Sequence, residues 1–240
     1  MILVLCDETD IAALWATDAL RRRGLSPRLL TGRELADVHG WRHTIGAAGV
    51  ETTLRLDGHD LRGDQVHGVL NRLAFLPQAW LATIGGADRD YAVQEMVAFY
   101  LSWLHALAGP KLNPPTPQGL CGNLRHPSAW IALGVRAGLP VRRFRQTSED
   151  DPAIYWQKPD DPAAATVFVV GDAVIGPAAL LAIHRDACLR FSNLAECPLL
   201  GIDFAPDIGG TWRMIAASVT PDLMRGGEAL ADALAATLAP

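Results

Sequence analysis

The chain has 240 residues, half of them apolar, and it carries a formal net charge of −5. This length can bury one full hydrophobic core, or one domain with a smaller second domain beside it. The mild negative charge argues against a nucleic-acid partner, and because no run of about 18 apolar residues occurs, no membrane-spanning helix is expected.

The first apolar run, Ile2–Cys6, lacks a basic start and a small-residue cleavage site, and Asp7 and Glu8 follow it directly. It therefore predicts a first buried β-strand and not a secretory signal. The four cysteines are scattered without a Cys-x-x-Cys pair, which favours buried, reduced thiols and a cytoplasmic protein. They are Cys6, Cys121, Cys188 and Cys197.

A strand–helix–strand unit opens the chain. Thr9 or Asp10 can cap a helix that ends at Gly24, residues 27–30 predict a second strand, and Thr31-x-x-Glu34 has the spacing of a capping box. This alternation is typical of a parallel α/β sheet. Residues 51–61 then predict a hairpin, and residues 66–73 predict a further strand.

Histidines are concentrated between residues 39 and 67. His39-x-x-x-His43 is a metal-ligand spacing only on a helix, and the intervening Gly40 and Trp41 disfavour a helix there. We therefore expect no metal site in this region.

A long helix ending near Leu107 is predicted by the apolar stripe that precedes Gly109-Pro110. After a short strand at residues 111–113, the sequence Pro114-Pro115-Thr116-Pro117 forces an extended connector. We place a domain boundary there, with residues 1–113 as an N-terminal α/β domain and residues 114–240 as a C-terminal lobe.

The second half of the chain contains one carboxylate in an apolar setting. Two apolar runs flank Gly209-Gly210, as in a β-hairpin, and the first of them holds Asp203. A buried acid needs a cation or hydrogen-bond donors, so Asp203 is either a cation ligand or a capped structural acid. The remaining patterns predict a helix ending at Gly138, a hairpin at residues 166–175, and helices at residues 178–194 and 222–238.

Several motifs occur in a fixed order along the chain: Val69-Leu70-Asn71-Arg72, Tyr91 with Glu95, Leu112-Asn113-Pro114, and Gly201-Ile202-Asp203-Phe204 followed by Pro221. In order and spacing they resemble the ATP-grasp ligases, in particular the peptide-modifying branch that includes ribosomal-protein glutamate ligase and graspetide ligases. The resemblance implies an α/β, ATP-grasp-like fold, with a parallel pre-grasp domain and an α+β grasp lobe. In that family ATP lies between two lobes, lysines neutralise its phosphates, and an Asp, a Glu and an Asn hold magnesium.

The chain departs from the family at the metal site. The positions of the family's Glu and Asn are Ser218 and Thr220 here, and the position of a family arginine is Thr166. Asp203 is therefore the one metal ligand that the resemblance leaves, and Mg²⁺ is usually held through several oxygen ligands that include carboxylates and phosphates. The resemblance therefore implies the fold of the family, whereas these substitutions argue against its magnesium-dependent chemistry.

Two further departures from the family concern the residues that would bind and cover the nucleotide. No lysine opens the helix that ends at Gly138, where Arg125 and His126 stand instead, and Lys158 is one of only two lysines in the chain. About twenty residues follow where the family would use well over fifty for the lid that covers ATP, a gap too short for a crossover and a sheet. The resemblance thus implies a reduced grasp lobe without the ATP lid.

These departures favour a degenerate ATP-grasp-like protein without ligase activity and without a cofactor. It would bind a peptide or a small acidic molecule, since arginine favours bidentate contact with carboxylates, or it would partner an active peptide-modifying enzyme. One alternative is an active, minimal ATP- and Mg-dependent carboxylate–amine ligase, and another is unrelated chemistry in the same cleft. The candidate ligand-binding residues are Arg72, Glu95, Arg125, His126, Lys158 and Asp203.

A grasp core without its lid would expose apolar faces and strand edges, which predicts a homo-oligomer or a heteromeric partner. We place this contact at residues 154–175, where Trp156, Val167 and Val169 are apolar.

Overall fold

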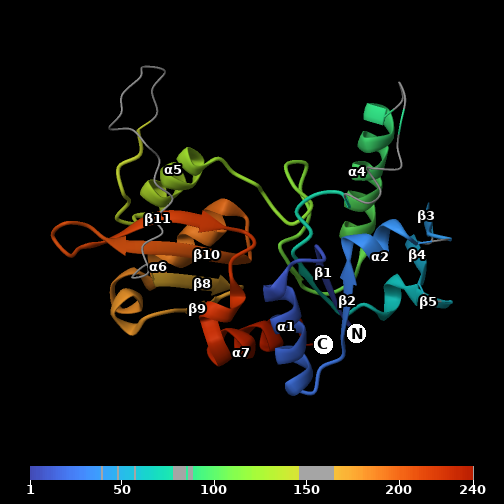
Figure 1. Ribbon diagram of the computed structural model, residues 1–240, viewed down its shortest axis with the longest axis horizontal. Helices are drawn as coiled ribbons and strands as arrows, with labels where there is room; N and C mark the ends of the chain where they lie inside the picture. The colour runs from blue at the N-terminus through green and yellow to red at the C-terminus, as the bar shows by residue number, and fades with distance from the viewer. Residues whose placement is uncertain are drawn as a thin grey trace. The chain divides into compact units, whose positions relative to one another are not determined.

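A computed structural model describes residues 1–38, 40–47, 49–56, 58–77, 85, 89–145 and 165–239 of the chain (Figure 1). They form two compact units. The first unit comprises Met1–Leu124 with Asp222–Pro240, and the second unit comprises Arg125–Pro221. The domain boundary between residues 113 and 114 stays a prediction, and the compact units differ from it in placing the C-terminal residues with the first unit.

A four-stranded parallel sheet with the strand order β2-β1-β6-β7 lies at the centre of the first unit. Its strands are β1 (Ile2–Cys6), β2 (Pro27–Thr31), β6 (Gly68–Asn71) and β7 (Lys111–Leu112). Every residue of β1 is buried, as expected for a central strand covered on both faces. β6 is shorter than predicted, because the Asn71 side chain accepts a hydrogen bond from the Leu73 backbone and turns the chain out of the sheet.

Helix caps fix the ends of the elements around this sheet. Asp10 caps α1 (Ile11–Arg22) by accepting a 3.0 Å hydrogen bond from the Ala13 backbone. Thr31 and Glu34 form the predicted capping box of α2 (Gly32–Ala36). The predicted helix 222–238 divides into a 3-10 turn, η2 (Leu223–Gly226), and α7 (Gly227–Leu238), because Gly227 takes a left-handed φ of 57° between them.

The C-terminal helix contacts the N-terminal part of the chain through ion pairs and through close packing. Arg23, just beyond α1, contacts Glu228 at 2.7 Å and Asp232 at 2.6 Å. At the other end of α7, a Cβ placed on Gly68 would lie 2.8 Å from the Leu238 carbonyl oxygen. Both contacts join segments that are far apart in the sequence, so residues 222–239 belong structurally with the N-terminal part of the chain.

A second, antiparallel sheet and a long helix complete the first unit. The sheet consists of β3 (Arg42–Gly46), β4 (Gly49–Leu56) and β5 (His59–Arg62), and the helix is α4 (Arg89–Ala106). A 3-10 turn, η1 (Gly63–Gln65), follows β5. Tyr100 and Trp103 of α4 are fully buried in a hydrophobic cluster that also includes residues of β1, β4 and β5.

Strand β3 was not predicted, and it bears on whether His39 and His43 could form a helical metal-ligand pair. His43 lies in this strand, where its ring nitrogens are 2.7 Å from the Thr52 hydroxyl and 2.8 Å from the Ser102 hydroxyl. His43 therefore lies in a strand, which does not give the i, i+4 geometry of a helical ligand pair, and His39 lies outside the described residues.

The second unit is built on an antiparallel sheet with the strand order β11-β10-β8-β9. Its elements are β8 (Ala165–Val170), β9 (Ala173–Ile175), β10 (Leu199–Pro206), β11 (Trp212–Ser218), α5 (Pro127–Ala137) and α6 (Ala178–Ala195). The predicted hairpins at residues 166–175 and around Gly209-Gly210 are therefore both confirmed. Val167 and Val169 are fully buried in β8, so they are not the exposed apolar surface that we expected, and Trp156 lies outside the described residues.

All four cysteines are buried, as predicted. Burial raises the pKa of the Cys6 and Cys188 thiols to about 12, so neither is a thiolate near neutral pH. Within the described ranges, no helix is both long and apolar enough to cross a membrane.

Gly201 in β10 offers a direct test of the sheet packing. A Cβ at this position would lie 2.5 Å from the Cβ of Pro221, so Gly201→Ala is expected to lower the free energy of unfolding by about 1–3 kcal/mol through overpacking. Gly209 in the hairpin turn is the matched control, because its nearest neighbour would be 3.4 Å away. Urea unfolding measures both variants, and equal stabilities would contradict the packing described here.

Candidate functional site

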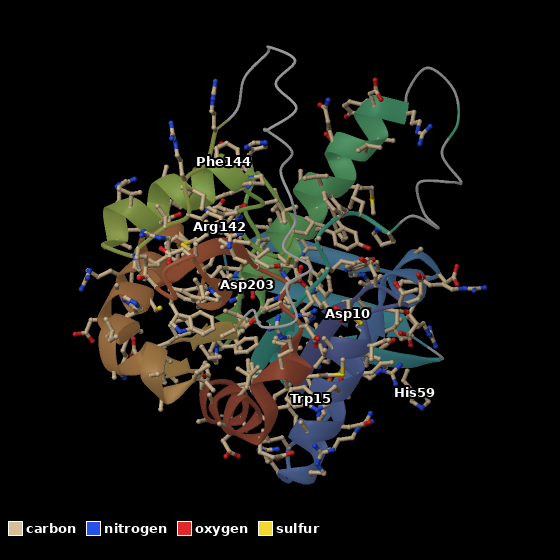
Figure 2. All side chains as sticks on the ribbon, turned by 60° about the vertical axis from the view of Figure 1, so that its left-hand side comes forward. Asp10, Trp15, His59, Arg142, Phe144 and Asp203 are labelled. Atoms are coloured by element: carbon tan, nitrogen blue, oxygen red, sulfur yellow. The ribbon has the colours of Figure 1, made fainter. Side chains whose placement is uncertain are left out.

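Strand β10 presents Asp203 on one face of the second unit's sheet. Phe204, the next residue, faces α6, where its ring stacks on His184 with the centroids 5.9 Å apart. Because side chains alternate along a strand, Asp203 points to the opposite face (Figure 2). Asp203 is half-buried between β8 and β11, with Thr166 and Ala216 directly opposite it.

The Asp203 carboxylate accepts a hydrogen bond from the Thr166 hydroxyl, with 2.6 Å between the two oxygens. This length is typical of a hydroxyl donating to an ionised carboxylate, a bond stronger than one between neutral groups. The strand register produces it, because residues directly opposite each other in an antiparallel pair project from the same face. Asp203 is therefore a hydrogen-bonded acid at the position where the resemblance implies a metal ligand.

The two positions predicted to partner Asp203 carry hydroxyls, and the Ser218 hydroxyl holds a local turn. Ser218 lies opposite Gly201, two residues along the strand from Asp203 and on the same face. Its Oγ accepts a 3.1 Å hydrogen bond from the Thr220 backbone, which turns the chain at the end of β11. Across the described residues, no group of three or more His, Cys, Asp or Glu side chains could hold a metal ion.

This donor set does not fit the magnesium ions that the fold implies. One carboxylate and two neutral hydroxyls stand at the positions where the resemblance implies two acids and an amide. Mg²⁺ demands near-octahedral oxygen coordination and loses its water reluctantly, so a single carboxylate contributes little of the binding free energy. We therefore derive no chemical step through a metal at Asp203.

Arg125 and His126, at the start of α5, have structural contacts. The His126 ring caps the helix, with Nδ1 accepting a 3.2 Å hydrogen bond from the Ser128 backbone. The Arg125 guanidinium lies 5.8 Å from the ring centroid of Trp130 and donates to the Ala195 carbonyl at 3.4 Å. The bond to Ala195 joins the start of α5 to α6, and the other two contacts lie within the segment that begins α5. The ligand-binding role of Arg125 and His126 stays a prediction.

Arg72 and Glu95 lie in the first unit. The Arg72 side chain is only 4% exposed, and it donates from Nε and Nη2 to the two Asp10 carboxylate oxygens at 2.7 and 3.1 Å. Such a bidentate pair is geometrically specific, and here it joins the end of β6 to the cap of α1. Glu95 is exposed on α4, and Lys158 lies outside the described residues.

The structure thus distributes the candidate residues between the two units and gives several of them local partners. Sequence reasoning missed Asp10 as the partner of Arg72, although the signal was present. Asp10 follows β1 and Arg72 follows β6, and the carboxyl ends of neighbouring parallel strands meet at the same edge of a sheet.

Comparison with solved structures identifies the fold. The chain is similar to macrocyclase MdnB from Microcystis aeruginosa MRC over 99% of both chains, with a TM-score of 0.69 and 13% identity. Macrocyclase MdnC from the same organism, bound with precursor peptide MdnA, gives a TM-score of 0.73 and 11% identity over 99% of both chains. The ATP-grasp ligase PsnB, complexed with a minimal precursor, Mg and ADP, gives 0.62 and 19%, covering 100% of this chain and 98% of PsnB.

At these identities the likeness establishes the fold, which is that of the ATP-grasp ligases, as the sequence motifs predicted. No protein-family model matches the sequence, and no curated protein matches it either. The stretch in which the missing lid was predicted, residues 146–164, lies outside the described residues.

The Arg72–Asp10 pair gives a test of which charges hold the first unit together. Asp10→Asn keeps a good helix cap but removes the charged half of a bidentate pair with a buried guanidinium, and we expect a loss of about 2–4 kcal/mol in unfolding free energy. Asp18→Asn, which removes an exposed partner of Arg21, is the control and should change stability little. Thermal and urea unfolding report the effect, and an equal response of the two variants would argue against a buried, stabilising pair.

Proposed function

We propose that the chain is a degenerate ATP-grasp protein that binds a peptide or a small acidic molecule, without ATP-dependent ligation of its own. The single observation that carries this proposal is the setting of Asp203, whose carboxylate accepts a 2.6 Å hydrogen bond from the Thr166 hydroxyl. Thr166, at the family position of an arginine, donates this hydrogen bond, so Asp203 has a neutral hydroxyl beside it where the family places a cation.

The chemistry of phosphoryl transfer supports this proposal. Most of the catalysis in such reactions is positioning and neutralisation of phosphate charge by metal ions and cationic side chains. At Ser218 and Thr220 the chain has hydroxyls, which are neutral and weaker ligands than a carboxylate. The changes act on one function together: Ser218 and Thr166 stand where the family has a charged glutamate and a charged arginine, and Thr220 stands where it has a neutral amide ligand.

The proposed class of ligand follows from two exposed arginines of the second unit. Arg142 and Arg143 are exposed on the segment after α5, and the Arg142 backbone is fixed to β11 by a 2.8 Å hydrogen bond to the Met214 carbonyl (Figure 2). Arginine suits planar, bidentate recognition of carboxylates. Proteins of the same fold have been crystallised with precursor peptides, which supports a peptide as the natural form of such a ligand here, either alone or with an active peptide-modifying enzyme.

Calorimetric titration with ATP and Mg²⁺ tests the loss of nucleotide binding. We expect no saturable heat at millimolar nucleotide, because the site lacks the charge to hold the metal, and Asp203→Asn should not change this result. The variant Ser218→Glu with Thr220→Asn restores the family's ligand types and should bind at least about tenfold more tightly than the native chain. Millimolar or tighter binding by the native chain that Asp203→Asn abolishes would favour the active-ligase alternative.

An oligoglutamate peptide labelled with fluorescein tests the ligand class. We expect its anisotropy to rise with protein concentration at low salt and to fall as salt screens the contacts. Arg142→Glu with Arg143→Glu should weaken binding several-fold, whereas Arg185→Glu, at an exposed position on α6 of the same unit, should not. Equal losses in both variants would indicate nonspecific attraction and would count against a site at residues 142–143.

A further inference from the structure

The outward face of α1 has an apolar half and a charged half. In the first half, Ile11 is 63% and Leu14 is 47% exposed, and Trp15 beside them is half-buried (Figure 2). In the second half, the outward residues are Asp18, Arg21 and Arg22, all exposed. The inward residues of the helix are buried, so the outward stripe is not needed for the packing of α1 in its own unit.

The two ends of this stripe carry opposite charge. Asp7 and Glu8 are exposed directly before the helix, and Arg21 and Arg22 are exposed in its last turn. Asp10 and Arg23 take no part, because Asp10 holds Arg72 and Arg23 holds Glu228 and Asp232. The acidic end is crowded: burial, together with the neighbouring Glu8 and Asp10 carboxylates, raises the pKa of Asp7.

We propose that a second copy of this chain docks on the outward face of α1, with the two α1 helices antiparallel about a twofold axis. A twofold contact is self-complementary, so that if residue i meets residue j, then j also meets i. Antiparallel helices place the acidic end of each copy beside the basic end of the other, twice. A parallel arrangement would instead bring like charges together.

The register follows from pairing the charged ends. The register that places Glu8 beside Arg21 and Asp7 beside Arg22 of the opposite copy also places Leu14 beside Trp15 at the centre, and Ile11 beside Asp18. Arg21 and Arg22 already contact Asp18 at 3.1 Å and Glu228 at 3.5 Å, but these pairs are solvent-exposed and exchange partners at little cost. Met224, 43% exposed on η2 where this turn packs against α1, adds apolar surface beside the helix.

The charge pattern favours a second copy over an unrelated protein, because one surface supplies both complementary halves. The contact is also small. A single helix face covers less than the roughly 800 Å² per partner of a standard stable interface, so we expect a dimer with a micromolar dissociation constant that forms with rising concentration.

Sedimentation velocity on the full chain, from about 1 to 100 µM, tests this dimer. The native chain should shift towards the dimer as its concentration rises, and Leu14→Glu should remain monomeric. Ile183→Glu, at a 76% exposed apolar position on α6 of the other unit, is the matched control and should dimerise like the native chain. A native chain that stays monomeric throughout, or a control that loses association as fully as Leu14→Glu, would overturn the proposal.

A mixing experiment tests the antiparallel register itself. Glu8→Arg and Arg21→Glu each put two like-charge contacts into their own homodimer, and each should weaken dimerisation about tenfold. In an equimolar mixture, the heterodimer of the two variants has opposite charges at both contacts and should form as well as the native dimer. Native thermal unfolding of each variant confirms that it is folded. No recovery on mixing folded variants would exclude this pairing.

Discussion

Strand β10 is the constraint on which the second unit depends. It is the strand that pairs with both β8 and β11, and its apolar residues are buried on both sides of the one acid that it carries. Its register places Thr166 opposite Asp203 and Ser218 two positions along the same face. Gly201 permits the close approach of Pro221 that follows β11. The chemistry of Asp203 is thus a consequence of strand pairing.

Fold and chemistry respond differently to substitution in such a sheet. Backbone hydrogen bonds and buried apolar side chains define the architecture, and they are indifferent to whether residue 218 is an acid or a hydroxyl. Metal and phosphate binding depend on the charge of a few side chains on one face. A chain can therefore keep the ATP-grasp fold while the charged side chains on one face of the sheet change.

Much of the fold could be predicted because local patterns and tertiary structure agree. The capping box at Thr31, the Gly138 helix end and the Gly209-Gly210 turn are local signals, and the structure contains all three elements. Strand β3 was missed because most of its residues are exposed, which removes the alternation of apolar and polar residues that marks a half-buried strand. The split of the last helix depended on the backbone angle of Gly227, which a helical pattern of apolar residues does not reveal.

The site was harder to predict than the fold, because its contacts join distant segments. Arg72 is a predicted ligand-binding residue, and the structure pairs it with Asp10, which is 62 residues away and which the sequence indicates only as a helix cap. Arg125 and His126 have the residue types of an anion site, yet the structure engages them in capping and packing contacts. Residue type suggests which groups can act, whereas partner geometry decides whether they are available.

The central claim is that the Asp203 face does not hold the metal of a nucleotide. Manganese accepts the same hard oxygen ligands as magnesium and is visible by electron paramagnetic resonance, so a titration of protein into Mn²⁺ and ATP tests the claim directly. If the Asp203 face does not hold the metal, the spectrum of ATP-bound Mn²⁺ is unchanged by the protein. A protein-dependent change in that spectrum that disappears in Asp203→Asn would contradict it.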